Sequence, residues 1–311
     1  MIHLRSRNVE NIFLDLLRES LQSSASTCDS RLGPMVDLGP VVFELLPGEI
    51  HVLDLPTRAI NPYLAIMEGA WILSGSQLLK PLSFITSVFN SFSDDGETLH
   101  GAYGHRLKQV NGIDLIEEAI KNLQNDPSSR RVVLPIYLPT DLLSRSKDIP
   151  CNVSMMLRIV NGRLDLTVIN RSNDLIYGVP YNCFSFSVIH YYVADRLSID
   201  VGIQRHYSNC MHVYEVNREF ALKIDAAGRN RSSVLRPDTR TFMKAVFDNA
   251  ETLTALRFDD VQDERLRSFF QEFERHKGEQ HRKALAVNND WLSNLASEWS
   301  MHQRTTSVAR L

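Results

Sequence analysis

Cys151 is the residue whose surroundings first suggest covalent chemistry. It lies in the segment KDIPCNVSMML (147–157), directly after a proline and at the start of a run that is typical of a strand. A thiolate is a strong nucleophile, and a neighbouring cation lowers the pKa of a thiol. A single cysteine in a strand is also commonly an inert core residue. The pattern around Cys151 is therefore compatible with both interpretations.

A hairpin is predicted to bring positive charge to Cys151. Two strand-like runs flank Asn161-Gly162, a pair that strongly favours a two-residue turn. The resulting register sets Cys151 opposite Ser172, with Arg171 adjacent. A one-residue slip or a bulge would change this pairing, so we expect adjacency more firmly than the register itself. Arg171 is then expected to lower the pKa of the thiol.

Glu68 is a carboxylate inside an otherwise apolar helix. The helix is predicted over 61–75, because it begins with Asn61-Pro62 and ends at a glycine. An apolar setting raises the pKa of a carboxyl group, which suits it to proton transfer. The alternative is a buried salt bridge with a structural role.

Several arginines and a serine could bind a phosphate group. Guanidinium groups bind phosphate through two parallel hydrogen bonds, and a hydroxyl adds a further contact. Exposed arginines at strand ends are also common and need no ligand. The candidates are Arg31, Arg130, Arg131, Arg171 and Ser172.

Three further side chains could read a nucleoside. Asn182 offers one acceptor and two donors, so its amide can match a pyrimidine edge. It could equally be the N-cap of the helix predicted over 182–199. His212 and Tyr214 alternate on a strand and so share one face, where they could hold a sugar hydroxyl or pack in the interior.

The elements that must position these residues indicate an α+β fold, with helices packed on a mixed sheet. The amphipathic segments 8–22, 112–129 and the charged region from 234 onward are predicted to be helical. Strands are predicted over 41–46, 50–55, 130–138 and 201–215, and loops over 23–34 and 93–108.

Composition excludes several other classes. The 311 residues carry a formal net charge of −3, without the basic excess of a nucleic-acid-binding protein. The four cysteines are scattered and form no CxxC pair, so we expect neither a structural zinc site nor another metal. The N-terminus does not read as a signal peptide, and no apolar stretch reaches the roughly 18 residues of a membrane helix. We predict a cytoplasmic protein with reduced thiols and no membrane partner.

Six ordered segments together resemble the thymidylate synthase family, which includes the deoxycytidylate hydroxymethylases. The resemblance spans roughly residues 31–215. It implies a thymidylate synthase-like fold, a sheet-to-sheet homodimer, a catalytic domain over 1–233 and a divergent helical extension over 234–311 packed on it. The segments that carry it are EGAWILSG (68–75), GAYGHR (101–106), DPSSRR (126–131), PCN (150–152), RSNDLIYGVPYN (171–182) and HVY (212–214).

The resemblance implies folate-dependent one-carbon transfer to C5 of a pyrimidine nucleoside monophosphate, with 5,10-methylenetetrahydrofolate as co-substrate. It assigns catalytic roles to Cys151 as the nucleophile, Glu68, Tyr103 and Asp174. It assigns nucleotide binding to Arg31, Arg171, Ser172, Asn182, His212 and Tyr214. It also makes Arg130 and Arg131 reach the phosphate in the neighbouring subunit, and it turns Trp71, Phe89 and Phe92 toward the folate.

The departures from the family bear on the product. Asn152, an auxiliary site residue, follows the nucleophile where the synthases usually have histidine, and Phe89 and Phe92 stand where tryptophans are expected. The chain ends in RTTSVARL, without the family's apolar closing tail. Hydride transfer from the folate needs water to be excluded. We therefore favour 5-hydroxymethylation of dUMP or dCMP, with reductive methylation of dUMP and a non-catalytic nucleotide-binding role as alternatives.

The base is a separate question. The deoxycytidylate hydroxymethylases carry Asp at the position of Asn182, and the family's uracil readers carry Asn. Asn182 therefore favours deoxyuridylate, although an amide can also present a matching face to cytosine.

Overall fold

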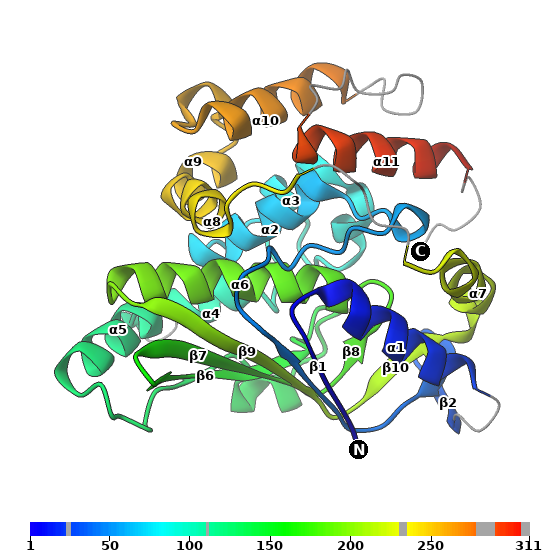
Figure 1. The fold of residues 1–311 in the computed structure, drawn as a ribbon, viewed down its shortest axis with the longest axis horizontal. Coiled ribbons are helices and arrows are strands. Elements are labelled where there is room, and N and C mark those ends of the chain that lie inside the picture. Colours follow the sequence, from blue (N-terminus) through cyan, green and yellow to red (C-terminus); the bar gives the residue numbers. More distant parts are fainter. Residues whose placement is uncertain (23–25, 110–111, 230–234, 278–289, 306–311) are drawn as a thin grey trace.

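Two β-sheets with helices layered on one side form the described part of the chain (Figure 1). The structure is a computed structural model that describes residues 1–22, 26–109, 112–229, 235–277 and 290–305. For residues 303–305 it describes the backbone alone. A six-stranded sheet has the order β1-β4-β9-β7-β6-β5, and a four-stranded sheet has the order β2-β3-β10-β8. The strands are β1 (Ile2–Ser6), β2 (Ser26–Ser30), β3 (Gly33–Asp37), β4 (Val41–Leu45), β5 (Val133–Pro135), β6 (Asn152–Val160), β7 (Arg163–Asn170), β8 (Asn173–Asp174), β9 (Asp200–Ser208) and β10 (Met211–Tyr214).

The helices cover one face of the larger sheet in successive layers. α6 lies on the sheet, α2 lies behind α6, and the C-terminal helices form the outermost layer (Figure 1). The α-helices are α1 (Val9–Leu21), α2 (Pro62–Leu73), α3 (Lys80–Ile85), α4 (Tyr103–Lys108), α5 (Leu115–Asn125), α6 (Val179–Arg196), α7 (Arg218–Ala227), α8 (Thr239–Asp248), α9 (Ala250–Thr254), α10 (Glu264–His276) and α11 (Trp291–Thr305). Short 3₁₀ helices include η1 (Pro56–Arg58), η2 (Ser87–Ser91), η4 (Pro139–Leu142), η5 (Glu215–Asn217) and η6 (Phe258–Asp260).

The β6–β7 hairpin forms around Asn161-Gly162 as predicted. Both turn residues have positive φ, 51° and 73°, which is the requirement of a two-residue turn that matches the twist of the strands. The predicted register holds from the turn as far as Ser154. A bulge between Asn152 and Ser154 then shifts the pairing by one residue, so that Asn152 faces Asn170. The prediction that Cys151 faces Ser172 was therefore wrong by one position, and Arg171 is its neighbour instead.

Residues 50–55 form no strand, contrary to the prediction. They are buried, which explains their apolar pattern, but their backbone groups bond to side chains rather than to a neighbouring strand. The Asp54 N–H donates to Glu10 Oε1 at 3.1 Å, and Arg236 Nη1 donates to the Ile50 carbonyl at 2.8 Å. An apolar run with satisfied backbone groups does not need a sheet.

Other predicted boundaries also moved. The run 201–215 divides at residues 209–210 into β9 and β10, which belong to different sheets, and the predicted loop 93–108 contains α4. The strand predicted over 130–138 is reduced to the three residues of β5. Side-chain alternation predicts a strand but cannot show where the chain leaves one sheet for another.

The α+β class is confirmed, and the helices predicted over 8–22, 61–75, 112–129 and 182–199 are all present. α2 starts as expected, because Asn61 Oδ1 accepts a hydrogen bond from Leu64 N at 3.1 Å and Pro62 occupies the first turn. The predicted domain boundary at 233–234 falls outside the described residues and stays a prediction. None of the described helices has the length and apolar character needed to span a membrane, and the cytoplasmic location stays a prediction.

Candidate active site

Cys151 lies at the start of β6, where Arg171 fixes the backbone around it. Arg171 Nε donates to the Pro150 carbonyl at 2.9 Å, and its Nη2 donates to the Ile149 carbonyl at 3.0 Å. The Arg171 N–H also donates to the Cys151 carbonyl at 2.9 Å. The guanidinium group thus orients the peptide that precedes the nucleophile, and it places positive charge near the sulfur.

Burial raises the pKa of the Cys151 thiol, although Arg171 and Arg31 act in the opposite direction. Asp148 and Asp174 add negative charge nearby and raise it further. The net direction is opposite to the one expected from the sequence, because burial outweighs a cation when the thiol is removed from water. Neutralisation of the nearby carboxylates, or an additional cation, would favour the thiolate.

Tyr103 is held against Cys151 by α4. A hydrogen bond joins the Tyr103 hydroxyl to the Cys151 backbone, and burial raises the pKa of Tyr103 well above its usual value. α4 packs closely on α2, since a Cβ on Gly104 would overlap the Ile72 carbonyl oxygen. Only glycine permits this approach of the two helices. The close packing therefore positions Tyr103.

Glu68 extends from α2 toward the same region. Burial raises the pKa of its carboxyl group to about 7. Burial is the main cause of the raised pKa of Tyr103 and of Tyr181, and the charge of Glu68 raises both further. The Glu68 carboxylate therefore lies within electrostatic reach of both hydroxyls. The alternative of a buried salt bridge has no support in the described residues, where no ion pair of Glu68 is found. A carboxyl group with a pKa near 7 can both donate and accept a proton.

The segment 171–182 folds back so that its asparagines meet. Asn182 Nδ2 donates to Asn173 Oδ1 at 3.1 Å, and Asn173 Nδ2 donates to Ser208 Oγ at 3.4 Å. Asn182 is not the N-cap of α6, because the helix begins at Val179 and Gly178 precedes it. The structural alternative for Asn182 is thus excluded, and its half-buried amide is oriented by Asn173.

Asp174 fixes the loop that follows it. Its Oδ1 accepts hydrogen bonds from Ile176 N at 2.7 Å and Tyr177 N at 3.1 Å. Burial raises the pKa of the Asp174 carboxyl, against the opposing effects of these N–H groups and of His212. Asp174 therefore combines a structural contact with a charge near the site.

His212 and Tyr214 lie on β10 beside Ser172. The two rings meet edge to face with centroids 4.9 Å apart, and His212 Nδ1 is 3.4 Å from Ser172 Oγ. His212 is buried, whereas Tyr214 and Ser172 are half-buried. β10 pairs in parallel with β8, so His212 lies opposite Asp174. The sheet thus brings both ends of the 171–214 region into one site.

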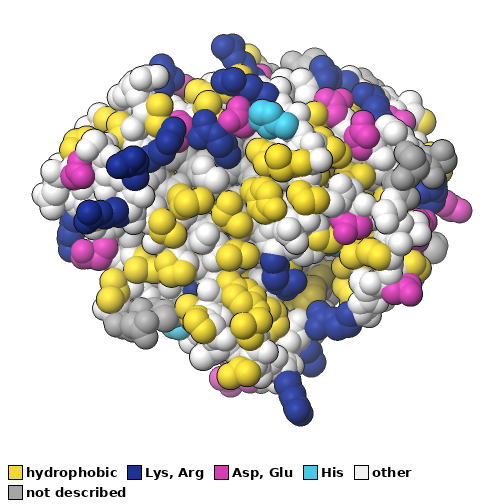
Figure 2. Space-filling model, turned by 90° about the horizontal axis from the view of Figure 1, so that it is seen from below, with side chains coloured by type: hydrophobic (Ala, Val, Ile, Leu, Met, Phe, Trp, Pro, Cys, Tyr) yellow, Lys and Arg dark blue, Asp and Glu magenta, His cyan; other side chains and the backbone are white. Residues whose placement is uncertain are grey.

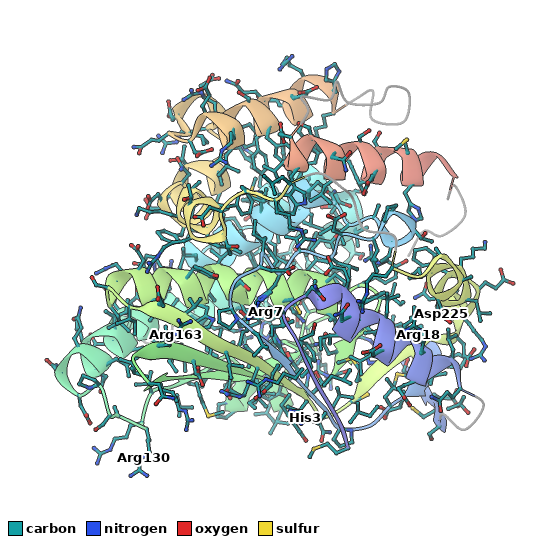
Figure 3. All side chains as sticks on the ribbon, in the orientation of Figure 1. His3, Arg7, Arg18, Arg130, Arg163 and Asp225 are labelled. Carbon is teal, nitrogen blue, oxygen red and sulfur yellow. The ribbon has the colours of Figure 1, made fainter. Side chains whose placement is uncertain are left out.

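The phosphate candidates separate into two groups. Arg31 is exposed beside the site, with Nη2 at 3.5 Å from the Lys147 carbonyl, and its charge reaches Cys151 and Tyr214. Arg130 and Arg131 are also exposed, but Arg130 projects away from its own chain below the sheet (Figure 3). Among the described residues, no hydrogen bond or ion pair joins Arg130 or Arg131 to Arg31 or Arg171.

The predicted folate-facing aromatics differ in exposure. Phe92 is 38% exposed and contacts the Phe89 ring at a centroid distance of 6.2 Å, next to η2. Trp71 is buried, and its Nε1 donates to the Leu78 carbonyl at 2.9 Å. Phe89 and Phe92 offer aromatic surface to a ligand, while Trp71 supports the segment that leads to them. Their role toward folate stays a prediction.

Three residues with a part in the site were missed by the sequence interpretation. Asp148 Oδ2 accepts from Gly101 N at 2.7 Å and ties the segment before Cys151 to the segment before Tyr103. Asn173 orients Asn182, and Arg58 Nη2 donates to the Ile176 carbonyl at 2.7 Å. Asp148 lies two residues before the PCN segment and Asn173 lies inside the segment 171–182, which is the signal that could have identified them.

The described residues contain no cluster of three or more His, Cys, Asp or Glu side chains that could hold a metal ion. The expectation of no metal stays a prediction. The site instead combines a thiol, a carboxyl group with a raised pKa, oriented amides and arginines. This combination is typical of an enzyme that uses a cysteine as its nucleophile and arginines to bind an anion.

Comparisons with known proteins identify the family. The thymidylate synthase family model matches residues 40–262, and the chain belongs to the thymidylate synthase family. It is 35% identical over 240 residues to the deoxyuridylate hydroxymethyltransferase of Pseudomonas phage M6, an alignment that covers 76% of this chain and 68% of that protein. The family assignment made from the motifs is confirmed.

Two further relatives show the range of the family. The chain is 32% identical over 191 residues to the deoxyuridylate hydroxymethyltransferase of Bacillus phage SP01, covering 57% of this chain and half (50%) of that protein. It is 30% identical over 162 residues to the thymidylate synthase of Francisella tularensis subsp. holarctica, covering 47% of this chain and 59% of that protein.

Proposed function

We propose that the chain catalyses 5-hydroxymethylation of deoxyuridylate, with methylenetetrahydrofolate as co-substrate. What supports this proposal is that Cys151 and Glu68 both lie within electrostatic reach of the Tyr103 hydroxyl, in a chain that is 35% identical to a protein named deoxyuridylate hydroxymethyltransferase. A second relative of the same name supports it. Reductive methylation to thymidylate is the alternative, because a thymidylate synthase is also among the relatives.

Cys151 starts the reaction by adding to C6 of the pyrimidine. The new S–C6 bond moves the electrons of the C5–C6 double bond onto C5 and O4, which makes C5 nucleophilic. Arg171 holds the backbone of the nucleophile in place. A bound phosphate would draw the guanidinium groups of Arg31 and Arg171 together beside the sulfur, because a dianion attracts both.

Glu68 is suited to proton transfer at C5 and O4. With a pKa of about 7, it can supply a proton to O4 as charge develops and take up the proton that leaves C5. Tyr103, close to both Cys151 and Glu68, can donate a hydrogen bond at the same end of the base. Methylenetetrahydrofolate, when bound, supplies the one-carbon unit, and the exposed ring of Phe92 beside Phe89 offers it a stacking surface.

Nucleotide binding divides among three contacts. Asn182, fixed by Asn173, presents an amide to the pyrimidine edge. His212 and Tyr214 meet the sugar, beside Ser172. We infer that Arg130 and Arg131 serve the phosphate of a partner subunit, because both are exposed and Arg130 projects below the sheet, away from the body of its own chain (Figure 3).

Release of tritium from C5-labelled deoxyuridylate, followed by the mass of the product, tests the function. We expect folate-dependent release and a product heavier than the substrate by one hydroxymethyl unit. A methylated nucleotide as the sole product would support the synthase alternative. Absence of release with deoxyuridylate, deoxycytidylate and their ribonucleotides would support a non-catalytic nucleotide-binding protein.

Asn182→Asp tests which base the site reads. A carboxyl group in place of the amide presents a different set of donors and acceptors, and it can accept hydrogen bonds from the cytosine amino group. We expect the ratio of kcat/KM for deoxycytidylate to that for deoxyuridylate to rise by about 5- to 150-fold, since one hydrogen-bonded contact discriminates by about 1 to 3 kcal/mol. An unchanged ratio would show that Asn182 does not read the base.

A further inference from the structure

On the core face of the sheet, next to Cys151 in the chain, several buried polar atoms have no hydrogen-bond partner in the part of the chain that the structure describes. Asn152 is fully buried, yet neither its Nδ2 nor its Oδ1 has a hydrogen-bond partner among the residues that the structure describes. Asn170, which pairs with Asn152 across β6 and β7, donates from Nδ2 to the Tyr207 carbonyl at 3.0 Å, but its Oδ1 has no partner there either. Buried side-chain amides are nearly always hydrogen-bonded, so such a pair indicates a bound polar species.

His206 adds a donor to the same face. Gln204 Nε2 is oriented by the Cys183 carbonyl at 2.9 Å and lies 2.9 Å from His206 Nε2, which therefore accepts. Burial lowers the pKa of His206 to about 3, so the ring is neutral and carries its proton on Nδ1. That Nδ1 is also without a partner in the described part of the chain. His206 pairs with Val168, two positions before Asn170 on β7, and so lies on the same face as Asn170.

Ring contacts connect His206, through Phe186, to the tyrosine that bonds to the Cys151 backbone. The Phe186 ring of α6 lies 6.0 Å from the His206 ring and 6.4 Å from the Tyr103 ring, and Tyr103 bonds to the Cys151 backbone. The unpartnered atoms thus lie between the sheet and α6, beneath the aromatic side chains that border the site. Together they offer both acceptors, Asn152 Oδ1 and Asn170 Oδ1, and donors, Asn152 Nδ2 and His206 Nδ1.

We propose that Asn152, Asn170 and His206 hold ordered water beside Cys151, and that Asn152 positions the water that completes the reaction. The inference rests on the proposed hydroxymethylation. After the one-carbon unit has joined C5, the base carries an exocyclic methylene group, which is electrophilic. The water oxygen forms a bond to the methylene carbon, and the electrons of the methylene–C5 double bond move into the ring. They re-form the C5–C6 double bond as the S–C6 bond breaks and releases the Cys151 thiolate, and the proton lost by water passes to a carboxylate or to solvent.

Asn152→Leu tests this assignment, because leucine keeps the size of the side chain and removes both polar atoms. The readout is hydroxymethyl nucleotide formed per tritium released from C5, with methyl nucleotide, dihydrofolate and the adduct of an added thiol measured beside it. We expect the hydroxymethyl yield per tritium to fall by at least about tenfold, as for loss of one positioned hydrogen-bonding group, while the other products rise. A structural defect would lower tritium release and product formation together and would leave their ratio unchanged.

Asn217→Leu is the matched control, since Asn217 on η5 is also buried, its Nδ2 has no partner among the residues with a described position, and it lies outside the cluster. It is expected to keep the wild-type ratio. Asn152→Thr suits a strand and keeps one hydroxyl, so it provides a second variant and is expected to give an intermediate ratio. Wild-type ratios in both Asn152 variants, or a higher KM without a change in ratio, would refute the assignment. A wild-type enzyme that releases no tritium, or forms only the methyl product, would instead refute the proposed function.

Discussion

At the scale of single residues, the Glu68 carboxyl links stability to activity. Its pKa is raised by burial to about 7 in the folded chain, from an ordinary value of 4.5. The folded state therefore binds more protons than the unfolded state between these two values. Stability that is fully present below about pH 4.5 is lost as the pH rises through about 7.

Replacement of Glu68 by Gln should remove this pH dependence. We expect Glu68→Gln to be more stable than wild type at pH 8 by roughly 2 to 3 kcal/mol, because each unit of pKa shift corresponds to about 1.4 kcal/mol. At pH 4 the two proteins should differ little. Urea unfolding at both pH values measures the effect, and tritium release should fall in the variant at every pH. Equal stability at pH 8 would mean that the carboxyl group is solvated rather than buried.

The site residues differ in how far the sequence could predict them. The motifs identify Cys151, Asn182 and His212 as candidate site residues, because each has a fixed position within a short sequence segment. The pKa of Cys151 could not be predicted from Arg171 alone, since its net direction depends on burial and on Asp148 and Asp174, which approach through tertiary structure. The pairing of Asn182 with Asn173 also depends on the fold of the loop between them.

At the scale of elements, the β6–β7 hairpin has Cys151, the proposed nucleophile, at one end and its turn at the other. Asn161 and Gly162 both have positive φ. Gly162→Ala places a side chain in a conformation that L-residues avoid, and it should destabilise the protein by about 1 to 2 kcal/mol. Thermal or urea unfolding checks this. Activity per folded molecule should be retained, because the turn is distant from Cys151 along β6.

Asn161→Gly is the matched control for the turn, since glycine adopts positive φ readily, and it should change stability by less than about 1 kcal/mol. Equal stability of Gly162→Ala and wild type would show that the turn does not constrain the hairpin.

The same hairpin shows what an element-level pattern can and cannot predict. The Asn-Gly turn determined the register from Val160 down to Ser154, where local geometry decides the pairing. The bulge between Asn152 and Ser154 has no clear sequence signal. It shifts the pairing by one residue, so that Arg171 and not Ser172 lies opposite Cys151. The strand predicted over 50–55 was wrong for a different reason. The backbone groups of this segment bond to the side chains of Glu10 and Arg236, which are remote in sequence.

At the scale of the whole molecule, Arg236 joins the C-terminal helices to the sheet-bearing part of the chain. Its Nη2 lies 2.7 Å from Glu10 Oε1 and 3.4 Å from Asp54 Oδ2, both buried, and its guanidinium group lies 5.4 Å from the Trp291 ring of α11. Tyr63 of α2 similarly stacks on Phe269 of α10 at 4.1 Å. These contacts cross the predicted boundary at 233–234, so the regions on its two sides should unfold together.

Arg236→Ala should destabilise the protein by about 3 kcal/mol, because it removes a cation that pairs with two buried carboxylates. Arg257→Ala is the control, since its pair with Asp260 is exposed and should contribute less than about 1 kcal/mol. Unfolding followed by tryptophan fluorescence and by circular dichroism should show one transition for the wild type. Two separate transitions would instead make 234–311 an independent domain.

The outer face of the larger sheet suggests how two chains meet. Figure 2 shows hydrophobic side chains spread over the face beneath the sheet, with arginines and lysines around them. Val133 and Met156 on this side are 52% and 36% exposed. An exposed apolar sheet face of this kind is typical of an interface between subunits. A symmetric dimer through this face would carry each Arg130, which projects beneath the sheet, toward the other subunit (Figure 3).

Subunit complementation tests whether the active sites are shared. If Arg130 and Arg131 bind the phosphate in the partner, each site of a C2 dimer needs residues from both chains. Cys151→Ser and a double Arg130→Ala, Arg131→Ala variant should each lose activity by at least about a hundredfold, since one lacks the nucleophile and the other lacks two charged phosphate contacts. Mixed and allowed to exchange subunits, they should regain up to about a quarter of wild-type activity, because half of the dimers are mixed and each of these holds one intact site.

Cys28→Ser mixed with the arginine variant is the control and should be active from its own sites, since Cys28 is exposed on β2. Activity in the Cys151→Ser mixture no higher than that of the separate variants, with subunit exchange verified by a tagged chain, would show that the arginines act within one chain or not at all.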